Sequence, residues 1–321
     1  MMMRRRVAVF VGFGLALVTA GAAAQSYPAR PVRIVVTVAP GGGNDFVARL
    51  VGQKLGERLG QQFIVDNRPG GGGTVATALV AKAAPDGYTL LLGFVGPLVM
   101  TPHVEKVAYD PLRDFVGVSL LASSYHILGV HPSLPVRSVK QFIAFAKAHP
   151  GELNYASANI WGPTHLVPEL FKSVAGVDIM PIHYRGAAPA AVGVLSGEAQ
   201  VIFAGVTALM AHVRSKRLVA LAVTSPARSP IAPELPTFAE LGYPRVEAPS
   251  WYSIMAPAAA PREVVGRLHE ELVKIAAMPD YREPLQRQGF EVQSSTPEQF
   301  AAFLQAEYDK WGRVIRALKP Q

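Results

Sequence analysis

Apolar runs typical of buried strands alternate with amphipathic stretches along most of this chain. In the first unit of this kind, the apolar runs predict strands at residues 33–38, 62–66 and 88–92. Helical patterns at residues 44–58 and 74–83, the second capped by Thr74, fill the intervals, and Pro85-Asp86-Gly87 has the chemistry of a turn. The order strand, helix, strand, helix, strand predicts parallel strands joined by right-handed crossovers.

A second unit of similar size follows. Its apolar runs predict strands at residues 116–122, 127–131, 153–156, 179–183, 199–203 and 218–223. Helices are predicted at residues 138–149, 165–174 and 187–195, with Ser138 as the N-cap of the first. Residues 157–163 are expected to form a loop.

Residues 226–249 then differ in texture, because prolines recur at positions 230, 233, 236 and 244. Proline-rich segments are semi-rigid connectors, so this one is expected to cross between two lobes. The apolar run 251–256 comes next, and helical patterns start at Pro261, Pro279 and Pro297 with no further strand. We expect these last helices to pack on the first unit.

The predicted fold class is therefore α/β, with two lobes joined by two crossings and a ligand cleft between them. Lobe 1 is expected to comprise residues 25–122 and 250–321, and lobe 2 residues 123–249. In such architectures a ligand lies in the crevice at the carboxyl ends of the strands.

The N-terminus has the pattern of a secretory signal peptide. Arg4, Arg5 and Arg6 precede an apolar run from residue 7 to residue 18, and Ala22-Ala23-Ala24 follows as a cleavage pattern. The apolar run is shorter than the ~20 residues of a permanent membrane anchor. Residues 1–24 are therefore expected to be removed after Ala24, which leaves the mature protein in the periplasm.

Composition excludes several function classes. The chain has no cysteine, so it has no disulfide and cannot be a thiol enzyme. The formal charge of +8 falls to +5 without the arginines of the signal peptide, and no lysine or arginine tract marks a nucleic-acid-binding face. Half of the residues are hydrophobic and 17% are charged, which is typical of a globular protein.

The glycine corner, residues 39–45, is the strongest candidate binding element. The strand at residues 33–38 runs into Ala39-Pro40-Gly41-Gly42-Gly43-Asn44-Asp45, and a helical pattern begins there. A helix N-terminus presents unpaired backbone N–H groups and the positive end of the helix dipole, so this corner is expected to bind a small anion. Asp45 is expected to stabilise the dipole and order the corner, and it could also accept a hydrogen bond from a ligand.

Motifs for catalysis or cofactor binding are incomplete. Residues 71–76 fit G-x-G-x-x-A, but the following strand ends without the acidic residue of a dinucleotide site, and no Walker lysine follows. There is no G-x-S-x-G elbow, and the eight histidines show no H-E-x-x-H spacing. We therefore expect no enzyme activity, no cofactor and no metal site. Trp161, in the loop at residues 157–163, could equally be loop packing or an aromatic wall of the cleft.

Several motifs resemble the Bug-type solute receptors, the extracytoplasmic binding proteins of tripartite tricarboxylate transporters. The longest are residues 38–49, 66–73 and 84–91; shorter ones are Asp114-Phe115, Tyr155-Ala156-Ser157, His165-Leu166, Tyr184-Arg185-Gly186, Pro236-Thr237, Ser250-Trp251, Glu307 and Trp311. The resemblance implies a type II periplasmic-binding-protein fold, and capture of a small carboxylate for a membrane permease. It implies that the glycine corner and the loop from Ser157 to His165 pinch the ligand carboxylate. The expected ligand-binding residues are Ala39, Pro40, Gly41, Gly42, Asn44, Asp45, Gly93, Ser157, Asn159, Trp161, Thr164, His165 and Tyr184.

The sequence departs from the family pattern mainly in the second lobe. The family usually has glycine where Asn159 and Trp161 stand, a small hydroxyl residue at Gly162 and proline at His183, and acidic residues are common at positions 200 and 204. Trp161 would narrow the pocket and add a stacking face, and the missing acidic groups disfavour a ligand amino group. The resulting hypothesis is an aromatic or otherwise bulky carboxylate as ligand.

Two functional classes remain open at this stage. The first is a monomeric transport receptor that delivers its ligand to permease subunits. The second is an extracytoplasmic sensor that presents its closed form to a signalling partner, and the same cleft would serve both. A secreted hydrolase would need a nucleophile, a base and an orienting group in one cleft, and the sequence shows no such set.

Overall fold

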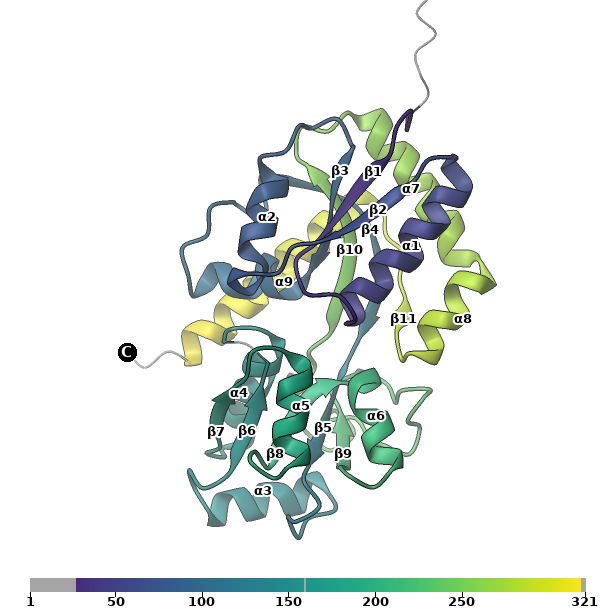
Figure 1. Cartoon of the computed structure of the whole chain (residues 1–321). Coiled ribbons are helices and arrows are strands. Elements are labelled where there is room, and N and C mark those ends of the chain that lie inside the picture. Colours follow the sequence, from purple (N-terminus) through teal and green to yellow (C-terminus); the bar gives the residue numbers. More distant parts are fainter. Residues whose placement is uncertain (1–26, 159, 319–321) are drawn as a thin grey trace, which may run out of the picture.

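The computed structural model describes residues 27–158 and 160–318, so the predicted signal peptide, its cleavage site and Asn159 lie outside the described residues. Two sheets form two lobes, one above the other in Figure 1. The first lobe is built on a six-stranded sheet with the order β11-β4-β10-β3-β1-β2, and the second on a five-stranded sheet with the order β7-β6-β8-β5-β9.

The first unit of the sequence forms the parallel half of the six-stranded sheet. Strands β1 (Val32–Val36), β2 (Phe63–Asn67) and β3 (Thr89–Phe94) pair in parallel, with β1 in the middle. Helices α1 (Gly43–Leu59) and α2 (Thr74–Ala81) connect them, and the glycines Gly71–Gly73 form a short 3-10 turn before α2. The predicted order is confirmed, although the N-cap of α2 is Gly73 and not Thr74.

The other half of this sheet is antiparallel. Strand β4 (Phe115–Ser124) and strand β10 (Ser250–Pro257) pair with each other, and β10 pairs with β3. Strand β11 (Glu291–Val292) pairs with β4, so the expectation of no strand after residue 261 was wrong. Two residues are too short a stretch for an alternation pattern, which explains why the sequence did not reveal β11.

The second sheet combines parallel and antiparallel pairs. Strands β6 (Asn154–Ser157), β7 (Met180–His183) and β8 (Val201–Gly205) are parallel to one another through β6. Strand β5 (His126–Val130) lies antiparallel between β8 and β9 (Val219–Val223).

Helices α3 (Val139–Ala148), α4 (Pro163–Ala175), α5 (Ala187–Leu195) and α6 (Val206–Arg214) complete the second lobe. The cap predicted at Ser138 is confirmed, because its hydroxyl accepts the backbone N–H of Gln141 at 3.2 Å. Helix α6 was not predicted. An apolar run continues from β8 through Gly205 into this helix, so no polar segment separates the two elements.

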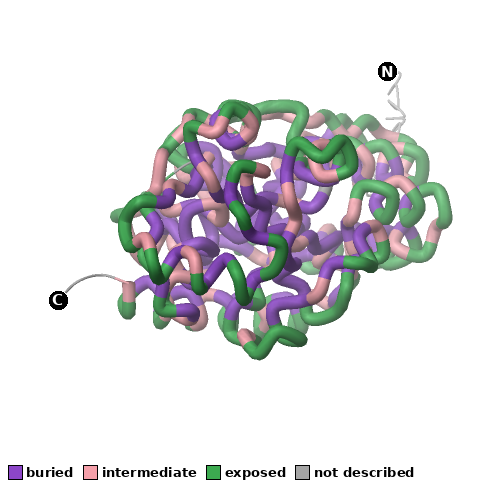
Figure 2. Tube along the Cα trace, turned by 90° about the horizontal axis from the view of Figure 1, so that it is seen from below, coloured by how far each residue is buried: buried purple, intermediate pink, exposed green. Residues whose placement is uncertain are grey.

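The C-terminal helices are α7 (Arg262–Ala277), α8 (Pro279–Arg287) and α9 (Pro297–Leu318), and they cover the first sheet as expected (Figure 1). Phe300 on α9 packs against Trp251 of β10, with ring centroids 6.0 Å apart, and both side chains are fully buried. Short helical turns lie at Gly96–Met100, Thr101–His103 and Pro244–Val246. Figure 2 shows buried segments running through the interior and exposed ones along the outer turns.

The chain passes between the two sheets from Ser124 to His126, and returns in the segment between Val223 and Ser250. The backbone N–H of His126 donates to the hydroxyl of Thr224 at 2.9 Å, and Thr224 accepts the N–H of Ala248 on its carbonyl at 3.3 Å. The two crossings are thus tied together at the waist of the molecule. The lobe boundaries at residues 122/123 and 249/250 stay predictions.

No helix within residues 27–158 and 160–318 has the length and apolar character needed to cross a membrane.

The packing of α9 on β4 gives a stability prediction. A Cβ atom at Gly117 would lie 1.8 Å from Cδ1 of Phe300, so Gly117→Ala should destabilise the fold by about 1–3 kcal/mol through overpacking. Gly266 on α7 has open space beside it, so Gly266→Ala is the matched control and should stabilise by about 0.5–1 kcal/mol. Urea unfolding of both variants measures this, and equal stabilities would contradict the packing described.

Candidate functional site

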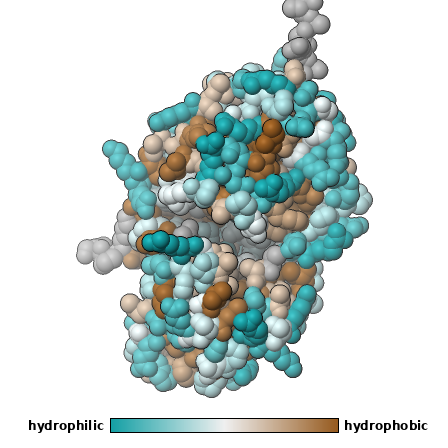
Figure 3. Space-filling model, in the orientation of Figure 1, coloured by the Kyte–Doolittle hydropathy of each residue, from teal (hydrophilic) through white to brown (hydrophobic). Residues whose placement is uncertain are grey.

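The strand directions bring the carboxyl ends of both parallel sets to the space between the lobes. Strand β4 runs toward the crossing and β10 runs away from it, so β3, antiparallel to β10, points toward the second lobe together with β1 and β2. Strand β5 runs away from the crossing, so β8, β6 and β7 point back toward the first lobe. Figure 3 shows the surface hollowed between the two lobes.

Helices that follow these strands begin on glycine. The N-cap residues are Gly42 for α1, Gly73 for α2, Gly162 for α4, Gly186 for α5 and Gly205 for α6, and none has a side-chain cap in the described part of the chain. Glycine cannot satisfy the first N–H groups of its helix with a side chain. Both sides of the hollow therefore present helix N-termini whose donors and dipoles favour an anion.

In the first lobe, the glycine corner leaves backbone donors available. The first N–H of α1 with a helical partner is that of Phe46, which donates to the carbonyl of Gly42 at 3.0 Å. The N–H groups of Gly43, Asn44 and Asp45 have no acceptor among the described residues. Residues 39–42 are exposed, and a Cβ at Gly41 or Gly42 would meet no atom within 4 Å. The corner therefore offers its main chain to the hollow.

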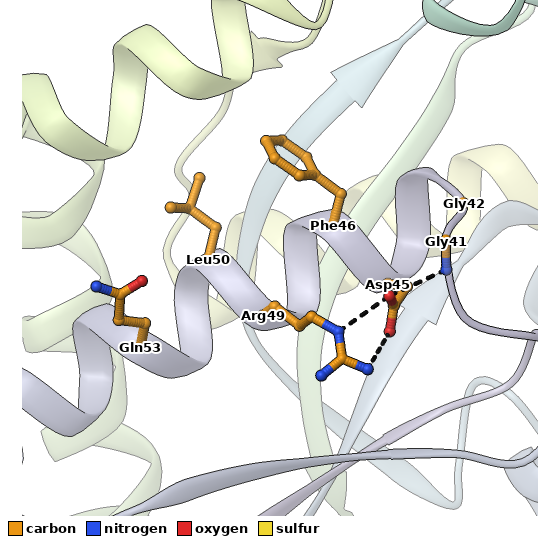
Figure 4. A pocket seen from close by; sticks show the side chains of 7 residues that line it. All are labelled: Gly41, Gly42, Asp45, Phe46, Arg49, Leu50 and Gln53. Carbon is orange, nitrogen blue, oxygen red and sulfur yellow. Dashed lines mark hydrogen bonds and ion pairs between the residues drawn. The ribbon is translucent and has the colours of Figure 1, made fainter.

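Asp45 holds the corner in shape. Its Oδ2 accepts the N–H of Gly41 at 3.0 Å and Nε of Arg49 at 3.0 Å, and its Oδ1 pairs with Nη2 of Arg49 at 2.9 Å (Figure 4). Arg49 also donates to Asn67 at 3.2 Å, and Asn67 donates to the carbonyl of Val38 at 3.2 Å. This network closes a ring around the corner, which supports the ordering role predicted for Asp45.

The Asp45 carboxyl is ionised at neutral pH. Burial raises the pKa of Asp45, but hydrogen bonds from Arg49 and Gly41 and the charge of Arg49 lower it by more, so the pKa lies below its ordinary value. Since Arg49 balances this charge, Asp45 does not leave an uncompensated negative charge beside the donors of α1. Asp45 lines a surface pocket of about 360 Å³. Phe46, Leu50 and Gln53, along the same helix, also line it (Figure 4).

Two polar atoms near the corner lack a partner. The hydroxyl of Thr37, at the end of β1, and Nδ2 of Asn44 are buried atoms with no hydrogen bond within the described residues. Thr37 packs against Gly73, because a Cβ at Gly73 would lie 3.0 Å from the Thr37 hydroxyl. Thr37 therefore lies between the glycine corner before α1 and the N-terminus of α2. Thr37 was not among the expected site residues, although a hydroxyl residue two positions before the glycine corner could have signalled it.

Gly93 lies deeper, in β3. It is buried, and a Cβ there would lie 2.7 Å from both Sδ of Met255 and Oγ of Ser253 on β10. The glycine is therefore required by sheet packing, and its predicted contact with a ligand stays a prediction.

In the second lobe, the loop between β6 and α4 is tied down at both ends. The carbonyl of Ser157, a fully buried residue, accepts the N–H of Tyr184 at 2.7 Å. The N–H of Ala158 donates to the hydroxyl of Thr164 at 2.9 Å. Ser157 and Thr164 thus have structural bonds in the loop at which they were expected to bind a ligand.

Trp161 has an uncommon backbone conformation. Its φ of 60° lies in the left-handed region that favours glycine, in agreement with the family pattern of glycine at this position. Its N–H donates to Nδ1 of His165 at 3.1 Å, and the two ring centroids are 5.1 Å apart. His165 in turn lies edge to face with His183, at 4.9 Å between centroids. The structure thus gathers Trp161, His165 and His183 into one ring cluster. Trp161 and His165 were expected in one ligand-binding loop, whereas His183 was not expected beside them.

Both imidazoles of the cluster are neutral near pH 7. Burial lowers the pKa of His165 to about 4, against the opposing charge of Glu169, and burial also lowers the pKa of His183. Glu169 accepts hydrogen bonds from Tyr155 at 2.7 Å and Lys172 at 2.9 Å, so its charge has its own partners.

Tyr184 directs its ring under α5. A Cβ at Gly193 would lie 2.1 Å from the Tyr184 hydroxyl, and burial raises the pKa of Tyr184 to about 12. The ring therefore packs inside the second lobe, and the role of Tyr184 in ligand binding stays a prediction.

The buried histidines predict acid-sensitive stability. His126 has 5% of its surface exposed and His165 has 7%, and burial lowers the pKa of each to about 4. In the unfolded chain these histidines have an ordinary pKa near 6.5, so as the pH falls they bind protons in the unfolded state before they bind them in the folded state. The contribution of each neutral histidine to the free energy of unfolding is therefore complete above pH 6.5 and is lost as the pH falls toward 4. The free energy of unfolding should fall by about 2 kcal/mol per histidine between neutral pH and pH 5.

Urea unfolding between pH 7 and pH 5 tests this, in a range where carboxylates with lowered pKa values still remain ionised. His126→Gln should remove about 2 kcal/mol of this fall, whatever the stability of the variant at pH 7. A flat profile for the unaltered protein would show that these histidines are not buried neutral in solution.

Comparison with known proteins agrees with this geometry. The family model for the tripartite tricarboxylate transporter family receptor matches residues 47–319. The chain is 36% identical to protein BugT of Bordetella pertussis over 98% of each chain. The structure of Rpa4515 from R. palustris with adipate aligns with a TM-score of 0.85 and 33% identity, covering 91% of this chain and 98% of that one.

MatC from Rhodopseudomonas palustris with bound malate aligns with a TM-score of 0.82 and 29% identity, over 90% of this chain and 100% of that one. These alignments span both lobes, so they confirm the predicted α/β two-lobe fold of type II periplasmic binding proteins. The chain therefore belongs to the tripartite tricarboxylate transporter receptor family, among the Bug-type solute receptors that its motifs predicted.

Proposed function

We propose that this protein is a periplasmic receptor that captures a small carboxylate between its lobes and delivers it to the permease subunits of a tripartite transporter. The single observation that carries the proposal is the set of glycine-capped helix N-termini on both sides of one hollow. The relatives with adipate and with malate hold carboxylates on the same fold. A ligand that touches both lobes stabilises their closed arrangement, which is the form a permease would recognise.

The receptor works without catalysis, cofactor or metal, and as a monomer that binds no nucleic acid. Its donors are backbone N–H groups, which hold a carboxylate but transfer no proton. Around the hollow the ionised side chain of Asp45 is occupied by Arg49 and Gly41, so it is not poised as a general base.

The preferred ligand in this proposal carries an aromatic ring. Trp161 is half-buried beside the N-terminus of α4 and presents an indole where a glycine would leave open space. Indole rings stack on aromatic ligands with a gain of about 0.5–1.5 kcal/mol beyond the area they bury. His165 and His183 are neutral, so the ring cluster around Trp161 presents uncharged rings to the ligand, and the charge of the carboxylate is left to the helix N-termini.

A thermal-shift panel of the mature protein with phthalate, benzoate, adipate, malate and citrate tests the proposal. A ligand at 100 times its dissociation constant stabilises by about 2.7 kcal/mol, which should raise the melting temperature by about 5 °C or more. Dimethyl phthalate, which has the ring without the charges, should give no shift.

A shift with phthalate or benzoate supports both the carboxylate site and the aromatic preference. A shift with adipate or malate alone keeps the receptor and rejects the aromatic ligand. No shift with any carboxylate, for protein shown to be free of bound ligand, would reject the proposed function.

A further inference from the structure

Trp161 occupies a backbone conformation that its own side chain disfavours. A φ of 60° brings the Cβ of any residue other than glycine close to the neighbouring backbone, and Lys216 is the other such residue in the described chain. A strained conformation persists only where surrounding contacts impose it. Some contact must therefore hold Trp161 in place at the rim of the second-lobe half of the site.

His165 provides that contact. The Trp161 N–H donates to Nδ1 of His165 at 3.1 Å, and the centroids of the indole and the same imidazole are 5.1 Å apart. His165 is itself fixed, because it is buried in the first turn of α4 and its own N–H donates to Gly162 at 2.9 Å. One rigid side chain thus binds both the backbone and the ring of Trp161.

We propose that His165 is a positioning residue, which acts through Trp161 to set the preference of this receptor for an aromatic carboxylate. The inference rests on the proposed function, and it assigns His165 a task other than direct ligand contact. Nδ1 must accept a hydrogen bond, so the single proton of the neutral ring sits on Nε2. Protonation of Nδ1 would replace the acceptor with a donor and release the loop.

The surroundings keep His165 in this form. The charged and titratable groups that face it are Glu169 and Lys172 on α4, Tyr155 on β6 and His183 on β7. The Glu169 carboxylate is bonded to Tyr155 and Lys172, and His183 is neutral. These groups leave the imidazole uncharged at the pH of the periplasm.

Two amide variants separate positioning from bulk. The side-chain oxygen of His165→Asn can occupy the place of Nδ1, whereas the longer His165→Gln carries its polar atoms near the place of Nε2. Calorimetric titration should show phthalate affinity within threefold of the unaltered protein for His165→Asn, and at least tenfold weaker for His165→Gln. Adipate affinity should change less than threefold in both. Equal losses in the two variants, or no loss in either, would overturn the proposal.

A double-variant cycle tests whether His165 acts through Trp161. With Trp161→Gly in place, the loop needs no support, so adding His165→Gln should change phthalate affinity by less than twofold. If His165→Gln still weakens phthalate tenfold in that background, His165 acts on the ligand directly and the positioning role is rejected.

Tryptophan fluorescence tests the inference without any ligand, so its failure can be distinguished from failure of the proposed function. The chain has three tryptophans. The exposed fraction of Trp251 and of Trp311 is 1% or less, whereas Trp161 is half-buried and accessible to a quencher. Acrylamide quenching should at least double in His165→Gln and stay unchanged in His165→Asn at pH 7. In the unaltered protein it should rise as the pH falls toward 4, and His165→Asn should remove that rise. Identical quenching in all three proteins would overturn the proposal even if phthalate binds.

Discussion

Replacing Asn44 by proline is expected to weaken carboxylate binding by about 10- to 100-fold. Asn44 is the second residue of α1, and its N–H has no acceptor among the described residues. Proline deletes that donor, and a hydrogen bond to a charged group contributes about 1.5–3 kcal/mol. The first turn of a helix tolerates proline, and α4 itself begins with Pro163. The residue before the new proline is Gly43, which lacks the Cβ that would clash with the proline ring.

The matched control is Asn44→Ala, which removes the same side chain and keeps the N–H. The ratio of the dissociation constants of the two variants for phthalate or adipate, measured by calorimetric titration, isolates the backbone donor from the buried Nδ2. A ratio near one, with both variants folded, would show that the N-terminus of α1 does not hold the carboxylate.

Removing the indole of Trp161 is the second change with a large expected effect. Trp161→Ala should weaken phthalate binding by about 10- to 100-fold, because it deletes a stacking face and the apolar area that the ring would cover. Adipate, which has no ring, should bind within threefold of its original affinity. Competition titrations of the two ligands on one protein preparation measure this change of preference.

Ile160→Ala is the control for this experiment. Ile160 is the neighbour of Trp161 in the same loop, and 55% of it is exposed. Its truncation should leave both affinities unchanged. If Trp161→Ala also leaves phthalate affinity and ligand range unchanged, the aromatic hypothesis is wrong while the receptor function stands.

The parts of the fold that were predictable are those in which one local pattern decides the outcome. The apolar run at residues 33–38, the glycine corner and the helix after it specify β1 and α1 without information from the rest of the chain. Ser138 likewise predicts the start of its helix, because the capping hydrogen bond joins Ser138 to Gln141, only three residues away.

The rest depends on contacts between distant residues. Strand β10 is apolar in sequence, but only its partners β3 and β4 make it antiparallel and place it in the first sheet. In the site, nothing local links His183 to Trp161, and the two belong to one cluster only because each lies against His165. The network of Asp45 with Asn67 is also invisible in sequence, since it joins α1 to the end of β2.

The glycine N-caps have an evolutionary consequence. A donor supplied by the main chain persists when side chains around it are exchanged, as long as the helix still starts at the same place. Mutation can therefore exchange the side chains that line the pocket, as at Trp161, while the backbone N–H groups still bind the carboxylate. Receptors built in this way can drift from one acid to another without passing through a form that binds none.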